Sequence, residues 1–108
     1  MMFVITNTIK VKKGYAEKMA SRPSQSMVGI PGFISMDLLV KRRNEEDCEE
    51  VIVWSKWESQ KAHNEFVASE HFKKMHNGVG GDHILDFKLS FYDVVRSSSI
   101  DEQQQNVI

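Results

Sequence analysis

The chain is poor in cysteine and lacks long apolar runs, and both shortages narrow what it can be. With one cysteine, Cys48, among 108 residues it cannot form an internal disulfide framework, which fits a reducing compartment. The acidic residues around Cys48 disfavour its thiolate and argue against a catalytic thiol. No segment approaches the roughly 20 apolar residues of a membrane span, and the first residues lack the basic start of a signal peptide. We therefore expect a cytoplasmic protein.

An excess of basic charge is also missing. The 14 basic and 15 acidic side chains give a formal net charge of −1, whereas a nucleic-acid-binding domain needs a basic patch or stripe. The sequence contains no GxGxxG, Walker, CxxC, HExxH or GxSxG motif. Nucleotide, zinc and serine-nucleophile chemistry therefore have no support. The proportions of hydrophobic and charged residues, 41% and 27%, are those of a globular protein rather than a disordered one.

The hydrophobic pattern predicts an α+β domain. Alternation of apolar and polar residues predicts four strands, over residues 3–11, 33–40, 51–57 and 84–95. Helical spacing predicts helices over residues 15–27, 60–67 and 70–76, with a break or kink at Pro23 and N-caps at Ser59 and Ser69. The order βαββαβ is that of a ferredoxin-like fold, in which helices cover one face of a four-stranded antiparallel sheet. We expect one domain over residues 1–96 and a polar tail over residues 97–108.

The face of the sheet turned away from the helices is predicted to be apolar too. The strand patterns assign eight residues to it: Ile34, Met36, Leu38, Val40, Ile52, Trp54, Tyr92 and Val94. An antiparallel sheet with one wet face would carry polar residues there. Because exposing such a patch costs roughly 25 cal/mol per Å² of apolar area, we expect a homodimer in which two sheets pack face to face.

Asn7 interrupts the apolar face of the first predicted strand. Phe3, Ile5, Ile9 and Val11 share that face with it. A buried amide must find hydrogen-bond partners, because leaving it without them costs free energy. Two interpretations stay open: the side chain caps a helix end or bonds a bulged backbone group, or it projects into a cavity and donates a hydrogen bond to a ligand.

His76 ends the last predicted helix and shares a stripe with Phe72. A neutral imidazole can bind iron through one nitrogen, and the helix dipole favours positive charge at a helix C-terminus. The alternative is a histidine that only complements the dipole. Three other histidines, His63, His71 and His83, compete as candidates, and the charged neighbours of His63 and His71 predict that these two lie on solvated faces.

Three stretches resemble the antibiotic-biosynthesis-monooxygenase superfamily. They are Ile30-Pro31-Gly32-Phe33, the run VIVWSKWES over residues 51–59, and residues 62–76, which end in FKKMH. Within this superfamily, an asparagine on the first strand together with a histidine that closes the FKxxH helix resembles the small haem-degrading monooxygenases of Gram-positive bacteria, the IsdG-like group. The similarity runs from about residue 3 to residue 95.

The resemblance implies a haem-degrading monooxygenase in which haem is both cofactor and substrate. It implies that His76 binds the iron and that Asn7 lies on the opposite side of the haem, where it hydrogen-bonds bound oxygen. Phe66 falls where the family has a tryptophan that distorts the porphyrin; phenylalanine keeps an apolar ring but loses volume and the indole N–H, so rate or product can differ. Phe72 and Phe91 are expected to pack on the macrocycle with it.

The resemblance also implies partners. Family members are homodimers whose sheets form a shared β-barrel, with one haem pocket in each subunit. The reaction needs O₂ and an external electron donor, a reductase, because the chain has no flavin or nicotinamide motif. Two other functions stay open: a cofactor-free oxygenase of an aromatic or quinol substrate, in which Asn7 and a histidine polarise the substrate, and a haem-binding protein without catalysis.

Overall fold

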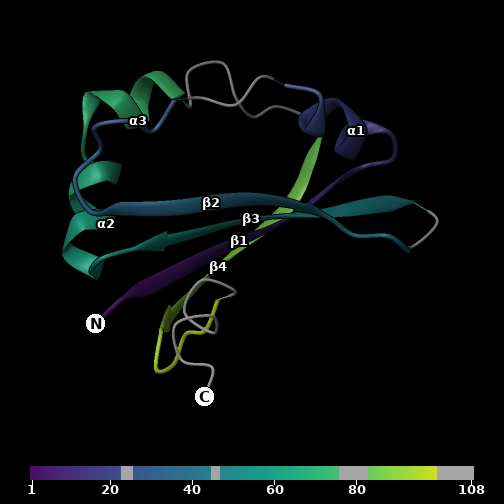
Figure 1. Ribbon diagram of the computed structural model, residues 1–108. Coiled ribbons are helices and arrows are strands. Elements are labelled where there is room, and N and C mark those ends of the chain that lie inside the picture. Colours follow the sequence, from purple (N-terminus) through teal and green to yellow (C-terminus); the bar gives the residue numbers. More distant parts are fainter. Residues whose placement is uncertain (23–25, 45–46, 76–82, 100–108) are drawn as a thin grey trace.

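A computed structural model describes residues 1–22, 26–44, 47–75 and 83–99, which contain one sheet and three helices. The elements are β1 (Phe3–Lys12), α1 (Tyr15–Ala20), β2 (Phe33–Val40), β3 (Cys48–Trp57), α2 (Gln60–Val67), α3 (Glu70–Met75) and β4 (Ile84–Asp93). The four strands pair antiparallel in the order β2-β3-β1-β4. All three helices lie on one face of this open sheet (Figure 1). The predicted ferredoxin-like α+β fold is therefore confirmed.

Local hydrogen bonds explain where the helices begin. The hydroxyl oxygen of Ser59 accepts a hydrogen bond from the backbone N–H of Ala62 (3.1 Å), and that of Ser69 accepts one from Phe72 (3.2 Å), as N-caps do. At α1 the capping group comes from β3: a carboxylate oxygen of Glu49 accepts a hydrogen bond from the backbone N–H of Gly14 at 2.6 Å. Both serine caps were predicted from the sequence, whereas this contact between distant segments was not.

Several boundaries differ from the prediction: β1 ends at Lys12 rather than at residue 11, β4 ends at Asp93 rather than at residue 95, and the differences at α1 and β3 are larger. α1 ends at Ala20 instead of continuing to residue 27, and the N–H and hydroxyl of Ser21 both donate to the carbonyl of Glu17. The sequence already contains the reason, since Pro23 cannot continue a helix. β3 begins at Cys48, three residues earlier than predicted, because Glu49 and Glu50 extend its pairing with β1. Residues 100–108 of the predicted tail lie outside the described residues.

The side of β1 that faces the helices carries two separate cores. One consists of Phe3, Ile5, Trp57 and Phe66 and packs under α2 and α3; the other consists of Ile9, Val11, Ala16 and Val51 and packs under α1. Asn7 lies between Ile5 and Ile9 on this side, at the point where the apolar core is interrupted. The helices therefore cover the two ends of the sheet (Figure 1), and Asn7 lies between the two cores.

The predicted apolar outer face is partly wrong. A bulge between Phe33 and Ser35 shifts the register of β2, so that Met36, Leu38 and Val40 pair with Ser55, Val53 and Val51 on the helix side. One extra residue in a strand reverses which side chains point to each face. Ile52 and Trp54 do lie on the outer face, beside Thr8 and Thr6 of β1, and Tyr92 lies there beside Val4. This face is consequently mixed rather than continuously apolar.

Among the described helices, none is long and apolar enough to cross a membrane.

Candidate functional site

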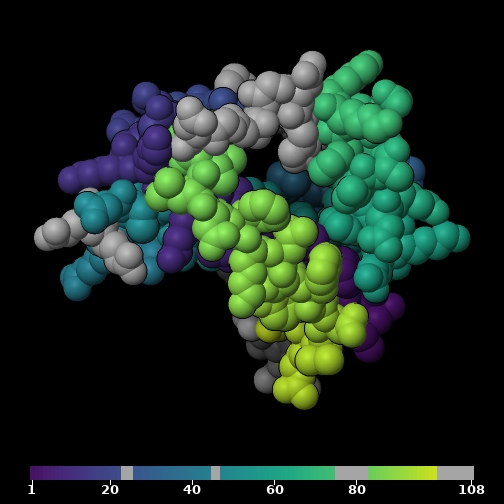
Figure 2. Space-filling view, turned by 180° about the vertical axis from the view of Figure 1, so that it is seen from behind, coloured from purple at the N-terminus to yellow at the C-terminus, as the bar shows by residue number. Residues whose placement is uncertain are grey.

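A cavity of about 810 Å³ lies between the helices and the sheet. Most of its walls are apolar, with Ile5, Ile9 and Val53 from the sheet and Met19 from α1 among the lining residues. In the space-filling view the surface is hollowed between β4, in light green, and α2 and α3, in darker green (Figure 2). Ligand sites in proteins enclose roughly 300–1,000 Å³ and have mostly apolar walls with a few polar groups. The cavity therefore has the size and lining of a small-molecule site.

Four of the five residues predicted from the sequence line this cavity. Asn7 comes from β1, Phe66 from α2, Phe72 from α3 and Phe91 from β4. The fifth, His76, lies outside the described residues. Sheet and helices thus bring together side chains that lie up to 84 positions apart in the sequence, from position 7 to position 91. Their roles toward a ligand stay predictions.

Asn7 presents a buried polar atom to a largely apolar wall. Its neighbours across the sheet are Val53 of β3 and Leu89 of β4, both apolar. The side-chain oxygen Oδ1 is buried and has no hydrogen-bond partner among the described residues. Buried polar groups in folded proteins nearly always have a partner, and a missing one costs about 1–3 kcal/mol. Among the described residues this oxygen therefore bonds no backbone group, which leaves a ligand or water in the cavity as a natural partner.

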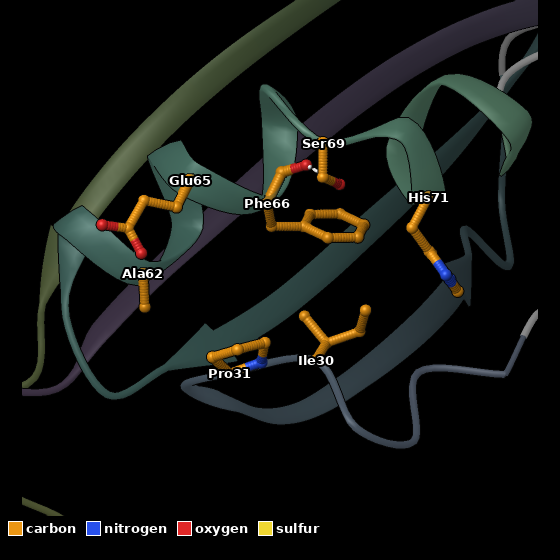
Figure 3. Close-up of a pocket in the computed structure, with 7 residues that line it drawn as sticks. All are labelled: Ile30, Pro31, Ala62, Glu65, Phe66, Ser69 and His71. Atoms are coloured by element: carbon orange, nitrogen blue, oxygen red, sulfur yellow. Dashed lines mark hydrogen bonds between the residues drawn. The ribbon is translucent and has the colours of Figure 1, made fainter.

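Phe66 separates the large cavity from a smaller hollow. Its side chain is 7% exposed, and its ring lies 5.2 Å from that of Trp57 and 5.4 Å from that of Phe72, edge to face in the second case. On the other side, the ring faces the hollow of about 200 Å³ seen in Figure 3, together with Ile30 and Pro31. At that volume the hollow lies below the usual range of ligand sites. Phe66 is thus a shared wall with free space on both sides.

His63 is a site residue that the sequence interpretation missed. We predicted a solvated face, but the side chain is partly buried and lines the large cavity. Its ring lies 5.8 Å from the ring of Phe3 and 5.4 Å from that of Trp57, nearly perpendicular to the latter. Its Nδ1 atom is buried and has no hydrogen-bond partner within the described part of the chain. The spacing of three residues between His63 and Phe66 was the signal that places both on one side of α2.

Burial also affects the charge of His63. It lowers the pKa of the imidazole below its ordinary value, while the neighbouring Asn64 side chain acts in the opposite direction. Removing a charged group from water disfavours its charged form. At neutral pH the side chain is therefore a neutral imidazole, which carries one N–H donor and one nitrogen acceptor.

The other two candidate histidines lie outside the large cavity. His71 is half-buried beside the smaller hollow (Figure 3), and its Nε2 lies 3.0 Å from the backbone carbonyl oxygen of Ser26. His83 stacks on Tyr15 with ring centres 4.8 Å apart and ring planes at 9°. Of these three histidines, His63 is the one that the fold brings to the cavity wall.

Two further polar groups of the wall are hydrogen-bonded to each other. The indole N–H of Trp57, a residue that is 1% exposed, donates to the hydroxyl oxygen of Ser55 at 3.1 Å. Within the described ranges, no three His, Cys, Asp or Glu side chains come together as a metal site. Among the described lining residues, the polar side chains besides Trp57 are those of Asn7, Ser55, which keeps a free O–H donor, His63 and, at the exposed rim, Asn64.

Comparisons of the sequence and of the structure with known proteins point to the same protein family. The model of the antibiotic biosynthesis monooxygenase (ABM) family matches residues 2–78. A Listeria welshimeri protein named heme-degrading monooxygenase is 38% identical over 84 residues, which cover 69% of each chain. A Bacillus cereus structure assigned to the antibiotic biosynthesis monooxygenases superposes with a TM-score of 0.72 at 31% identity, over 91% of this chain and 97% of the other.

A third comparison bears on the fold. The heme-degrader MhuD from Mycobacterium tuberculosis, with two hemes bound in its active site, superposes with a TM-score of 0.70 at 23% identity, over 90% of this chain and 99% of MhuD. A family model that covers residues 2–78 and a structural match over nearly the whole chain agree with each other. The chain belongs to the antibiotic biosynthesis monooxygenase family.

Proposed function

We propose that this protein is a haem-degrading monooxygenase, which binds haem in the cavity of about 810 Å³ and cleaves the porphyrin oxidatively to release iron. The observation that carries the proposal is that a largely apolar cavity of that size brings Asn7 together with three aromatic side chains, those of Phe66, Phe72 and Phe91. The name of the Listeria relative supports the same activity.

The lining of the cavity fits a flat, apolar macrocycle. Phe66, Phe72 and Phe91 supply aromatic rings from three different elements, and aromatic rings pack well on extended π-systems. α3, which carries Phe72, ends at Met75. The predicted iron ligand His76 is the next residue along the chain, so it follows directly after a helix that borders the cavity.

Each residue has a distinct task in this proposal. Haem, when bound, supplies the iron centre at which O₂ reacts, and an external reductase supplies electrons. Phe66, held by Trp57 and Phe72, would press on one region of a bound macrocycle and so limit which of its carbons is accessible. Asn7 offers its amide as a fixed hydrogen-bonding group in a largely apolar wall.

We also propose that the protein is a homodimer that packs through the outer face of the sheet. Val4, Ile52, Trp54 and Tyr92 lie on that face beside polar neighbours such as Thr6. Tyr92 is 52% exposed in the single chain, which leaves apolar area for a second copy to cover. Light scattering coupled to size-exclusion chromatography gives the mass directly, and Trp54→Lys is expected to shift a dimer toward monomer.

The test of the activity is an aerobic haem titration. We expect haemin to bind in a one-to-one ratio with a shifted Soret band, and the band to disappear with release of iron once a reductant is added in air. His76→Ala is expected to lose the part of the Soret shift that comes from coordination of the haem iron by this histidine. His71→Ala is the matched control, because His71 bonds the carbonyl of Ser26 outside the large cavity.

The same titration separates the other two functions. A spectrum that survives reductant and oxygen indicates a haem-binding protein without catalysis. Weak haem binding that is easily displaced, together with turnover of a quinol-type substrate, indicates a cofactor-free oxygenase. If His76→Ala binds and degrades haem like the parent protein, the proposed ligand role of His76 is wrong.

A further inference from the structure

The two ends of the large cavity differ in the polar side chains that the described lining residues place there. At one end α2 contributes two neighbouring polar side chains, His63 in the wall and Asn64 at the exposed rim. At the other end the lining residues Met19 of α1 and Ile84 of β4 pack against the core under α1. α1 and α2 stand over opposite ends of the sheet (Figure 1). A ligand with one polar edge therefore meets a matching asymmetry along the cavity.

The packing of His63 does not explain why a histidine stands there. Its ring lies against the rings of Phe3 and Trp57, so an aromatic hydrocarbon side chain would make the same contacts. Nδ1 is buried and meets no hydrogen-bond partner in the ranges that the structure describes. Because a buried polar atom without a partner is unfavourable, the imidazole weakens the free protein unless a ligand completes it.

We propose that His63 is a specificity-determining residue that binds a carboxylate on the edge of the substrate. This inference rests on the proposed function, since haem carries two propionate carboxylates on one edge and apolar substituents elsewhere. The N–H of a neutral imidazole donates to the carboxylate, and the amide of Asn64 at the rim offers a second donor. The carboxylate edge then lies at the α2 end, and the apolar edge points toward Met19 and Ile84.

The orientation has a consequence for the reaction. A carboxylate edge held at the α2 end fixes the rotation of the macrocycle about its own centre, and hence which meso carbon faces Asn7 and Phe66. Asn7 lies four residues along β1 from Phe3, the ring beside His63, which is roughly 13 Å of extended strand. His63 thus binds the edge of the substrate, whereas Asn7, farther along the cavity, faces the centre of the macrocycle.

The experiment compares haemin with its dimethyl ester, in which both carboxylates are blocked. Dissociation constants for both are measured by quenching of tryptophan fluorescence with the parent protein, His63→Phe, His63→Gln and the matched control His71→Phe. We expect the parent to prefer the diacid by about tenfold, the size expected for a hydrogen bond to a charged group. His63→Phe should weaken diacid binding alone and remove the preference, whereas His71→Phe should keep it.

Binding of the ester checks that the cavity of each variant is intact. His63→Gln retains an N–H donor and should keep part of the preference, so the test does not depend on the phenylalanine variant folding well. Equal weakening of both ligands by His63→Phe would show a packing role only, and an unchanged preference would show that the carboxylates lie elsewhere; either result overturns the proposal. Haemin that binds with the expected preference but is not degraded leaves this inference standing and removes the proposed activity. A parent protein that binds neither porphyrin refutes both.

Discussion

Replacing Asn7 with leucine should make the free protein more stable. The two side chains have similar shapes, and the position faces apolar neighbours, Val53 and Leu89, across the sheet. The buried Oδ1, which has no partner in the described part of the chain, currently costs about 1–3 kcal/mol. Asn7→Leu removes that cost and adds apolar contact, so we expect the free energy of unfolding to rise by about 1 kcal/mol or more.

The assay is thermal unfolding without haem, followed by circular dichroism. For a domain near 100 residues, 1 kcal/mol corresponds to roughly 4–8 °C in the melting temperature. The contrasting control is Asn44→Leu: the Asn44 side chain donates to the carbonyl of Lys41 at 3.0 Å and accepts from the N–H of Glu50 at 2.9 Å. Since both of its bonds are lost, the same substitution there should lower the melting temperature.

The two variants should thus shift in opposite directions. A melting temperature for Asn7→Leu that is equal to or below that of the parent would mean that the oxygen is satisfied in solution, by water for example. The argument from its buried, partnerless state would then fail. Under the proposed function, Asn7→Leu should also still bind haemin, because the wall stays apolar, but should degrade it more slowly, which a single-turnover measurement with reductant reports.

Three further predictions concern the surroundings of the cavity. Gly32→Ala should lower the free energy of unfolding, measured by urea titration, by roughly 1–3 kcal/mol, since Gly32 has φ +77° and a new Cβ would overlap the Cβ of Ala62. Gly29→Ala is the control: Gly29 has φ +83° but open space around it, so the same titration measures the backbone strain alone. Phe66→Trp should be tolerated within about 1 kcal/mol, because a hollow of about 200 Å³ lies beside the ring, while the rate or the product pattern of haem degradation should change. His63 makes the free energy of unfolding depend on pH, because its pKa is lower in the folded than in the unfolded chain. The stabilisation by the neutral imidazole is complete above the ordinary pKa of about 6.5 and is lost as the pH falls toward the pKa of the folded state. Melting curves between pH 5 and 8 should show that His63→Phe loses less stability at acid pH than the parent does, and parallel curves for the two proteins would contradict the assignment.

Patterns confined to one strand or one helix were predictable from the sequence. The alternation of β1 places Asn7 among apolar residues without any knowledge of its neighbours, and the structure puts it on the side that faces the helices. Ser59 and Ser69 cap their helices as predicted, because capping involves atoms only three residues apart.

Features that depend on contacts between elements were not predictable. The bulge at Phe33–Ser35 arises from pairing with β3, and it reverses the facing of three apolar residues that the strand pattern alone put on the outer face. The environment of His63 depends on the packing of α2 against Phe3 and Trp57, whereas its charged neighbours in sequence suggested solvent. In both cases the deciding contact joins residues of different helices or strands, which a pattern within one element does not report.

The position of the cavity follows from how the short helices divide the sheet. α1 has 6 residues and α2 has 8, so each covers one end and builds one core, while the middle of the sheet around Asn7 has no core residue over it among the described residues. As a result Phe87 and Leu89, both lining residues from β4, remain 62% and 47% exposed in the single chain. A ligand that covers them gains roughly 25 cal/mol per Å² of apolar area, the same free energy that the two cores gain on folding. If haemin completes this middle core, as proposed, binding and stability must be coupled: at a free haemin concentration 100 times its dissociation constant, the free energy of unfolding should rise by about 2.7 kcal/mol.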